Sequence, residues 1–316
     1  MKHEVLVPLD GSVLSEAALP HAIRMAQASQ SQVHLLRVVL PPIVSSPLAW
    51  SVPVAIDSER IIEAEKTVAR RYLDMIQTKL NALGVETIVS IEEGDPATCI
   101  LELAEKNPQV GSLVMASQGH SRLHRWTLGS VAQRVLHNTP VPLMIVPSDA
   151  TEPLELDAPV VGYERIMVPL DGSRFAEQAL GMARTLSDYS KATVHLFSVV
   201  PFMDSRELAE SGIVPMWTVN EQQSIRRRVT TYLDDTALYL TRAGLHVQTS
   251  TLEGYPAEAI VAAAETANID LVIMSTHGRS GLSRLWLGSV AIGVIHHSRV
   301  PVLLIRAQEE QHERAA

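Results

Sequence analysis

EVLVPLDGSVLSEAALPHAIRMAQASQSQVHLLRVV (residues 4–39) and RIMVPLDGSRFAEQALGMARTLSDYSKATVHLFSVV (residues 165–200) are two stretches of one chain that align without a gap. Sixteen of the 36 aligned positions are identical, including the run VPLDGS. Each stretch begins with a short apolar run, passes through Asp-Gly-Ser into helical spacing, and ends in a second apolar run. This pattern predicts the start of a βαβ unit, present twice.

The remainder of the chain repeats in the same order. EGDPA (93–97) matches EGYPA (253–257), and GHSRLHRWTLGSVA (119–132) matches GRSGLSRLWLGSVA (278–291). Collinear matches over the full length indicate that a whole domain has been duplicated. A length of 316 residues suits two domains of ordinary size.

We therefore expect a first domain over residues 1–147 and a second over residues 165–307. Between them, the segment SDATEPLELDAPVVGYE (148–164) is acidic and contains proline, as linkers often do. The last residues, 308–316, are expected to form a flexible tail.

Within each copy, short apolar runs alternate with segments of helical spacing. In the first copy the expected strands are residues 5–9, 33–39, 87–91, 112–116 and 141–146, and the expected helices are 13–29, 57–82, 95–106 and 129–137. Runs that are apolar at every position suit parallel strands buried on both faces. The pattern predicts an α/β fold of two tandem doubly wound domains, each with a five-stranded parallel sheet in the order 3-2-1-4-5. Residues 40–56 and 201–219 interrupt the pattern and are predicted to be long loops.

Composition excludes several classes of function. With 35 acidic and 26 basic residues, the formal net charge is −9, which gives no general basic surface for nucleic acid or an anionic membrane. No apolar run approaches the ~20 residues of a membrane span, and the first residues show no signal-peptide core. The single cysteine, Cys99, permits no disulfide within the chain. We expect a cytoplasmic protein without nucleic-acid or membrane partners.

Polar residues of the repeat gather where the first and fourth strands end. Asp10 and Asp171 follow the first strand, and Gly129–Ser130 and Gly288–Ser289 open the last helix. In the expected sheet these two strands are neighbours, and ligands bind outside their carboxyl ends. Glycine amides and a helix N-terminus favour a phosphate, while a carboxylate suits a ribose hydroxyl or Mg²⁺ held through water. Helix capping by the serines and an Asx-turn at the aspartates are the structural alternatives.

On these residues, both halves resemble universal stress protein domains over nearly the whole chain. ATP-binding members of that family carry Pro-x-Asp at the first strand and the pattern G-x-x-G, nine residues, then G-[ST]. Here the longer pattern reads Ala116-S-Q-Gly119, nine residues, Gly129-Ser130, and then Ser275-T-H-Gly278, nine residues, Gly288-Ser289. Small residues, alanine and serine, thus replace the first glycine. Each adds a Cβ atom at the strand end, which is tolerable where φ stays negative.

The resemblance implies an adenine nucleotide alpha hydrolase-like fold that binds ATP, with or without Mg²⁺, in each half. The prolines and aspartates would lie beside the adenosine, Val38 and Val199 would line the adenine pocket, and the glycine loops would hold the phosphates. The residues implied in ATP binding are Pro8, Asp10, Val38, Ala116, Gly119, His120, Arg122, Gly129, Ser130, Val131, Pro169, Asp171, Val199, Ser275, Gly278, Arg279, Gly281, Gly288, Ser289 and Val290. Gly281 stands where the first loop has Arg122, which leaves the second loop freer to close.

Three functions are compatible with these features. The first is a regulatory ATP-binding protein of the stress response, in which nucleotide occupancy changes conformation or assembly. The second is an interaction scaffold that needs no nucleotide, because the family includes non-binders and the first glycine is replaced. The third is a slow Mg²⁺-dependent ATPase using Asp10 or Asp171, although the sequence shows no catalytic motif or general base. We predict the first function, without enzymatic activity.

The final strand of each copy carries an expectation about assembly. VPLMIV (141–146) and VPVLLI (300–305) are apolar, yet each would lie at the edge of its sheet. Exposed apolar edges are usually covered or paired. We expect the two edges to pair within one chain as a pseudo-dimer, and further association into a homodimer is compatible with the sequence.

Overall fold

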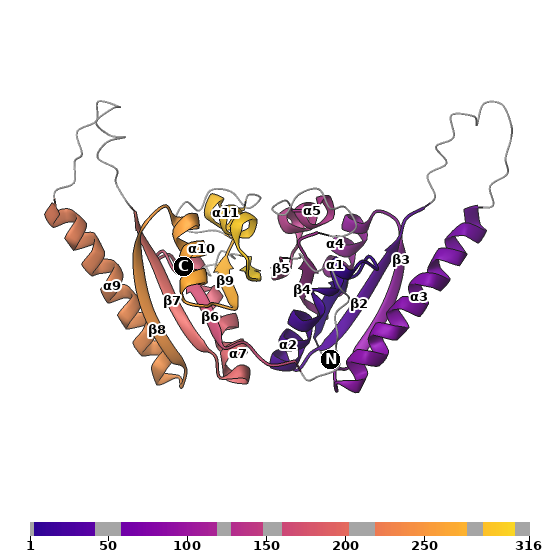
Figure 1. The fold of residues 1–316 in the computed structure, drawn as a ribbon, viewed down its shortest axis with the longest axis horizontal. Coiled ribbons are helices and arrows are strands. Elements are labelled where there is room, and N and C mark those ends of the chain that lie inside the picture. Colours follow the sequence, from indigo (N-terminus) through magenta and orange to yellow (C-terminus); the bar gives the residue numbers. More distant parts are fainter. Residues whose placement is uncertain are drawn as a thin grey trace, which may run out of the picture. The chain divides into compact units, whose positions relative to one another are not determined.

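A computed structural model describes residues 3–41, 58–118, 128–147, 160–201, 219–276 and 287–306. The chain divides into two compact units, Met1–Val160 and Val161–Ala316, each a sheet with flanking helices (Figure 1). The predicted long loops and tail lie almost entirely outside the described residues, as does most of the predicted linker.

The first unit follows the predicted alternation of strands and helices. Its elements are β1 (Glu4–Pro8), α1 (Val13–Glu16), α2 (Leu19–Ser29), β2 (Gln32–Val39), α3 (Ser58–Ala82), β3 (Thr87–Glu93), α4 (Pro96–Lys106), β4 (Val110–Ala116), α5 (Ser130–Asn138) and β5 (Leu143–Val146). All strand pairs are parallel, and the order is β3-β2-β1-β4-β5. The predicted order 3-2-1-4-5 is therefore confirmed. Helix α3 lies along β2 and β3, and α4 packs against α5 (Figure 1).

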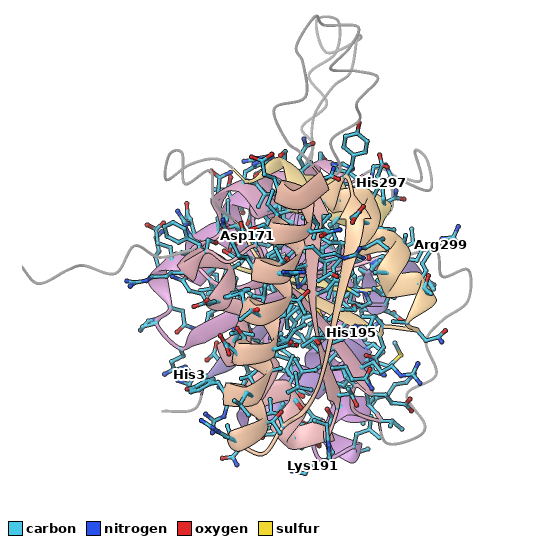
Figure 2. The ribbon with its side chains drawn as sticks, turned by 90° about the vertical axis from the view of Figure 1, so that its left-hand side faces the viewer. His3, Asp171, Lys191, His195, His297 and Arg299 are labelled. Atoms are coloured by element: carbon cyan, nitrogen blue, oxygen red, sulfur yellow. The ribbon has the colours of Figure 1, made fainter. Side chains whose placement is uncertain are left out.

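The second unit repeats this arrangement. Its elements are β6 (Arg165–Pro169), α6 (Arg174–Glu177), α7 (Ala179–Ser190), β7 (Thr193–Pro201), α9 (Val219–Arg242), β8 (His246–Gly254), α10 (Pro256–Thr266), β9 (Leu271–Ser275), α11 (Ser289–His297) and β10 (Val302–Ile305). Within the unit the strands lie in the order β8-β7-β6-β9-β10, again parallel. Figure 2 places Asp171 and Lys191 at opposite ends of the unit, with His195 between them. The pairing of the final strands of the two units stays a prediction.

The first helix of each unit differs from the prediction, because it is broken near its start. Residues 13–29 form a single turn, α1, and then α2, which has Pro20 in its first turn. Proline has no N–H to donate to the preceding turn, so the helix cannot run through this point. Gly181 occupies the matching position of α7, where glycine also weakens a helix.

The cores are aliphatic, as the scarcity of aromatic residues predicts. Val5, Leu6 and Val7 of β1 are almost completely buried, which confirms a central strand apolar on both faces. Phe197 of β7 is the aromatic exception among the largest fully buried side chains. Strand β3 is only half-buried and ends in the exposed Glu92 and Glu93, because it lies at the sheet edge.

Gly293 lies at a close contact between two helices of the second unit, α10 and α11. A Cβ atom added there would lie 2.7 Å from the Cβ atom of Ala257, so α10 and α11 approach closely at this point. We expect Gly293→Ala to lower the free energy of unfolding by about 1–3 kcal/mol through overpacking, measured by urea denaturation. The matched control is Gly181→Ala, where a Cβ atom meets nothing within 4 Å. That change should stabilise α7 by about 0.5–1 kcal/mol, and equal effects of the two substitutions would contradict the packing argument.

Candidate functional site

The turn after the first strand is built in the same way in both units. Asp10 Oδ1 accepts the Ser12 N–H at 2.9 Å, and Asp171 Oδ1 accepts the Ser173 N–H at 2.9 Å. Gly11 has a φ of +80°, a conformation that favours glycine. The predicted Asx-turn is therefore present, and the aspartates have a structural role in fixing the turn. Any contact with a ligand would be additional to it.

Ser12 and Ser173 cap the short helices that follow these turns. The Ser12 Oγ accepts the Ser15 N–H at 3.2 Å and also donates to Asp10 Oδ1. The Ser173 Oγ accepts the Ala176 N–H at 3.2 Å. Each of these two serines therefore links the turn to the start of a helix.

The helix after the fourth strand begins differently. Gly129 occupies the N-cap of α5 and Gly288 that of α11, and neither cap has a side-chain hydrogen bond. Ser130 and Ser289 are the first helical residues, so the alternative that these hydroxyls cap their helices is wrong. Both serines are exposed. Each helix thus starts with backbone N–H groups that its own N-cap residue leaves uncapped, which is an arrangement suited to an anion.

These turns and helix starts lie at the edge of each sheet that is formed by the carboxyl ends of its strands. Strand β1 pairs with β4, and β6 pairs with β9, so their carboxyl ends are adjacent. The Gly129 N–H donates to the Ser117 carbonyl at 2.8 Å, and the Gly288 N–H donates to the Thr276 carbonyl at 2.8 Å, which holds each helix start against the end of its strand. In each unit the structure therefore brings the two polar segments together at the predicted switch point.

The remaining implied residues fall into two groups. Described residues at or beside this edge are Pro8, Val38, Val131, Pro169, Val199 and Val290, all partly buried. The implied loop residues Gly119, His120, Arg122, Gly278, Arg279 and Gly281 lie outside the described residues.

The residues that replace the first motif glycine are accommodated without backbone strain. Ala116 and Ser275 end β4 and β9, and each is only 6% exposed. Among the described residues, the non-glycine positions with positive φ are Gln30, Lys191 and Asn268. Both replacements therefore keep the negative φ expected of an L-residue.

Arg37 adds a positive charge to the first site that the sequence reasoning missed. Arg37 lies within β2, after the buried residues of that strand, and its Nη1 donates to the Leu9 carbonyl at 3.3 Å. Its guanidinium lies 3.4 Å from the point where a Cβ atom of Gly11 would be. The second unit has the buried Ser198 at the matching position. The alignment of the repeats contains this difference, which could have shown that the two sites carry unequal charge.

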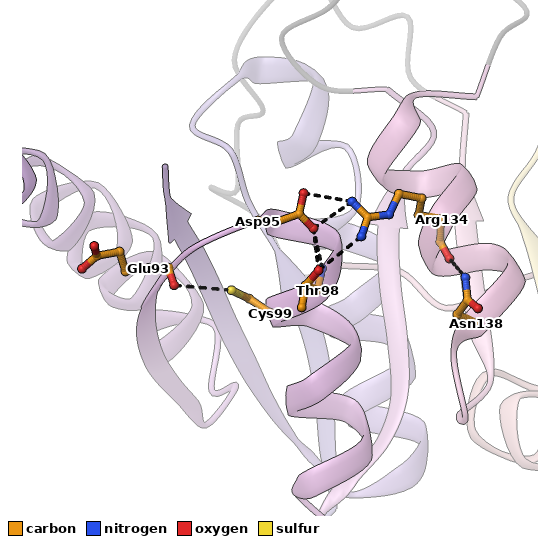
Figure 3. Close-up of polar contacts among 6 residues, drawn as sticks. All are labelled: Glu93, Asp95, Thr98, Cys99, Arg134 and Asn138. Atoms are coloured by element: carbon orange, nitrogen blue, oxygen red, sulfur yellow. Dashed lines mark hydrogen bonds and ion pairs between the residues drawn. The ribbon is translucent and has the colours of Figure 1, made fainter. Parts of the chain in front are cut away.

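An ion pair connects helices α4 and α5 of the first unit (Figure 3). Arg134 of α5 donates to both oxygens of Asp95, at 2.9 and 2.8 Å, and to the Thr98 hydroxyl at 3.2 Å. Asp95 also caps α4 by accepting the Thr98 N–H at 2.9 Å. The hydrogen bonds from Thr98 and the Arg134 charge hold the pKa of Asp95 below its usual value. This pair fixes α5, whose N-terminus lies at the candidate site.

Asp95→Asn tests this pair through its pH dependence. Asparagine retains the helix cap, so the change removes mainly the charge. Because the folded-state pKa of Asp95 is lowered, its contribution to stability is present above the unfolded pKa and is lost as the pH falls through the folded pKa. Both partners are half-exposed, so we expect a difference in unfolding free energy of only about 0.5 kcal/mol near neutral pH. Urea denaturation should show this difference disappearing in acid, and a difference independent of pH would contradict the pairing.

Cys99, the single thiol, lies beside this cluster. Its Sγ is 3.8 Å from the Glu93 carbonyl, and burial and the nearby carboxylates of Glu92, Glu102 and Asp95 raise its pKa. A raised pKa keeps the thiol protonated and weakly nucleophilic.

A buried network of polar side chains crosses the sheet of the first unit. His34 Nδ1 lies 2.9 Å from Glu4 Oε2, and its Nε2 lies 2.7 Å from the Ser90 hydroxyl. Glu4 and His34 are 3% and 6% exposed, and Asn107 donates to the same carboxylate at 3.0 Å. The sequence signal for the burial of His34 is its position within the apolar run of residues 33–39.

The second unit keeps half of this hydrogen-bonded network. His195 Nε2 lies 2.8 Å from the Ser250 hydroxyl, while Arg165 stands where the first unit has Glu4. Burial lowers the pKa of His195. Because the histidine and serine recur without the acid, we interpret them as a structural pair that connects the second and third strands of each unit.

Three further features of the described residues bear on function. They contain no group of three or more His, Cys, Asp or Glu side chains placed to hold a metal ion. His296 and His297 lie in the last turn of α11, where His297 contacts the Gly293 carbonyl at 2.8 Å, as expected for residues that complement the helix dipole. No helix in the described part of the chain is both long and apolar enough to cross a membrane.

The fold and the site define a class of protein: a tandem pair of doubly wound α/β domains with a polar site at the switch point of each sheet. The universal stress protein family profile matches residues 1–147 and 162–306, and the chain belongs to this family. A universal stress protein of Mycobacterium tuberculosis is 26% identical over 316 residues, covering 96% of this chain and 97% of its own. One from Methanocaldococcus jannaschii is 29% identical over 153 residues, covering 47% of this chain and 85% of its own. The crystal structure of a universal stress protein from Archaeoglobus fulgidus has the same fold, with a TM-score of 0.65 and 21% identity over 96% of this chain and 98% of that one.

Proposed function

We propose that this universal stress protein binds ATP at the switch point of each unit and acts as a regulatory protein, with nucleotide occupancy changing its conformation or assembly. The observation that carries this proposal is the start of α5 and of α11. Each helix begins at a glycine without a side-chain cap, beside the Asp-Gly-Ser turn of the neighbouring strand. Exposed backbone N–H groups at a helix N-terminus are a general means of binding phosphate.

The residues at this edge suit the parts of a nucleotide. The N–H groups at the start of α5 and the exposed Ser130 hydroxyl can donate to phosphate oxygens. Val38, half-buried near the end of β2, offers an apolar contact to a base. Asp10, held by its turn, presents a carboxylate to a ribose hydroxyl or to Mg²⁺ through water. The matching residues of the second unit are Val199, Asp171 and Ser289.

We infer binding rather than turnover. Each aspartate already accepts a hydrogen bond in its turn, and the pKa of Cys99 is raised, so neither is poised as a base or a nucleophile. A slow Mg²⁺-dependent ATPase and a nucleotide-independent scaffold remain the alternatives. The burial of Ala116 and Ser275 favours binding over the scaffold, because their side chains pack inside the protein.

Titration of the full chain with ATP tests the proposal. We expect up to two ATP molecules per chain, because both units have the same helix start. We expect the second unit to be the more readily occupied of the two. Isothermal titration of the Gly129→Val and Gly288→Val variants would assign each binding event to one unit. A chain that binds no ATP, with or without Mg²⁺, would leave the scaffold as the function. Release of phosphate during the titration would instead support the ATPase.

A further inference from the structure

Helix α3 exposes a line of apolar side chains. Ile61, Val68 and Met75 are 41%, 66% and 50% exposed, although all three are large and apolar. They are seven residues apart, so they lie almost on one line along the helix, drifting by only ~20° per repeat. The core-facing side chains of α3 are a separate set: Ala69, Leu73, Ile76 and Leu80. We call Ile61, Val68 and Met75 the α3 stripe.

The second unit shows that the fold does not require the stripe. Tyr72 of α3 donates to Glu16, and Tyr232 of α9 donates to Glu177, at 3.0 and 2.9 Å, which fixes the register of the two helices. In this register the three stripe positions correspond to Glu221, Arg228 and Asp235. Helix α9 therefore lies along its sheet with charged residues at these positions. The apolar residues of α3 must serve something other than the folding of a unit.

Charged residues border the stripe in a self-complementary pattern. Glu65 and Lys79 lie four residues after a stripe position, and Arg60 and Asp74 lie one residue before one. Glu65 and Lys79 thus lie on one flank of the stripe, and Arg60 and Asp74 lie on the other. In a parallel pair of helices, each flank faces the opposite flank of the partner helix. Arg60 would then face Glu65 of the second copy, and Asp74 would face Lys79. Within the described chain, the side chains of Glu65, Asp74 and Lys79 have no ion pair.

An antiparallel pair fits less well. It would set each flank against its own copy and bring Arg71 close to the second Arg71, with like charges opposed. In the parallel pair the two arginines lie on opposite sides of the contact. Ala64 and Thr78, which neighbour the stripe, are small enough for two helices to approach closely.

We propose that the α3 stripe is a homodimer interface, in which α3 of one chain packs parallel to α3 of a second copy about a two-fold axis. Val68 lies at its centre and contacts the Val68 side chain of the second copy. The stripe is narrow, so the dimer forms reversibly, with a Kd in the micromolar range expected of a small interface. This interface belongs to the first unit and does not depend on nucleotide binding.

Disulfide trapping tests the geometry directly. In a Cys99→Ser background, Val68→Cys should give a covalent dimer under mild oxidation, because a parallel contact brings the two residues within disulfide range. Arg70→Cys is the matched control, since Arg70 is exposed on the same helix but lies off the stripe. We expect at least tenfold more cross-linked dimer from position 68. Equal cross-linking of both variants, or none, would overturn the proposal.

Sedimentation equilibrium on the full chain tests the energetics. Val68→Glu should raise the dimer Kd at least tenfold, and because Val68 is 66% exposed the circular dichroism spectrum should not change. Lys79→Glu and Asp74→Lys should each raise the Kd about threefold, and the double variant should restore it. A dimer that does not respond to Val68→Glu, or charge reversals that simply add, would place the interface elsewhere and refute the proposal. A chain that stays monomeric at all concentrations would refute it as well.

Discussion

Gly288→Val is expected to weaken ATP binding in the second unit by about 100-fold, or roughly 2.7 kcal/mol. Gly288 is the N-cap of α11, with φ of −61° and ψ of 144°, so valine can adopt its backbone conformation. The branched side chain would instead occupy the space through which a phosphate approaches the N–H groups of the helix. The loss should therefore appear in affinity and not in folding.

The controls for this variant are available in the same chain. Gly181→Ala changes a glycine of the same unit in open space on α7 and should leave the affinity unchanged. Gly129→Val makes the matching change in the first unit, where a new Cβ atom would lie 3.4 Å from the Ser117 carbonyl, an ordinary contact. It should remove binding in the first unit only. An unchanged affinity in a folded Gly288→Val variant would show that the phosphate assignment is wrong.

Glu4→Ala is expected to have the largest effect on stability, lowering the free energy of unfolding of the first unit by about 3 kcal/mol. The Glu4 carboxylate is 3% exposed and accepts hydrogen bonds from Asn107 and from Gln32, at 3.0 and 3.3 Å, beside its contact with His34. Its removal leaves the buried His34 and the partly buried Asn107 and Gln32 without their acceptor, and the desolvation penalty of the buried group is then uncompensated.

Urea denaturation of graded variants measures this effect. Glu4→Gln keeps an acceptor oxygen and should be destabilised less than Glu4→Ala. Ser90→Ala removes the hydrogen bond between Ser90 and His34, at one end of the network. It should lower the unfolding free energy by about 1 kcal/mol. If Glu4→Ala were no more destabilising than Ser90→Ala, the buried network would not contribute as proposed.

The fold could be predicted from the sequence because the repeat made its signals redundant. VPLDGS marks the end of a buried strand and the cap of a helix in both units, and the strand order followed from the alternation of strands and helices. The break between α1 and α2 was missed because helical periodicity continues across Pro20. The burial of Glu4 was missed because a charged residue at the start of a strand usually lies in solvent, and its partners are distant in the sequence.

The candidate site was predictable in its position and less so in its details. Asp10 and Gly129 come together because the carboxyl ends of neighbouring parallel strands meet at one edge. The role of Asp10 in its own turn was foreseen only as an alternative. Arg37 was missed because an arginine in a strand is usually solvated, and only the folded chain shows its guanidinium over the Gly11 turn.

The most direct test of the account is the identity of any nucleotide that the protein retains. Freshly purified full-length protein would be denatured, and the released small molecules identified and quantified by mass spectrometry. We expect an adenine nucleotide, with ATP predominant, and a markedly lower amount from the Gly129→Val, Gly288→Val double variant. Absence of any adenine nucleotide, together with no uptake of added ATP in the presence or absence of Mg²⁺, would contradict the proposed function.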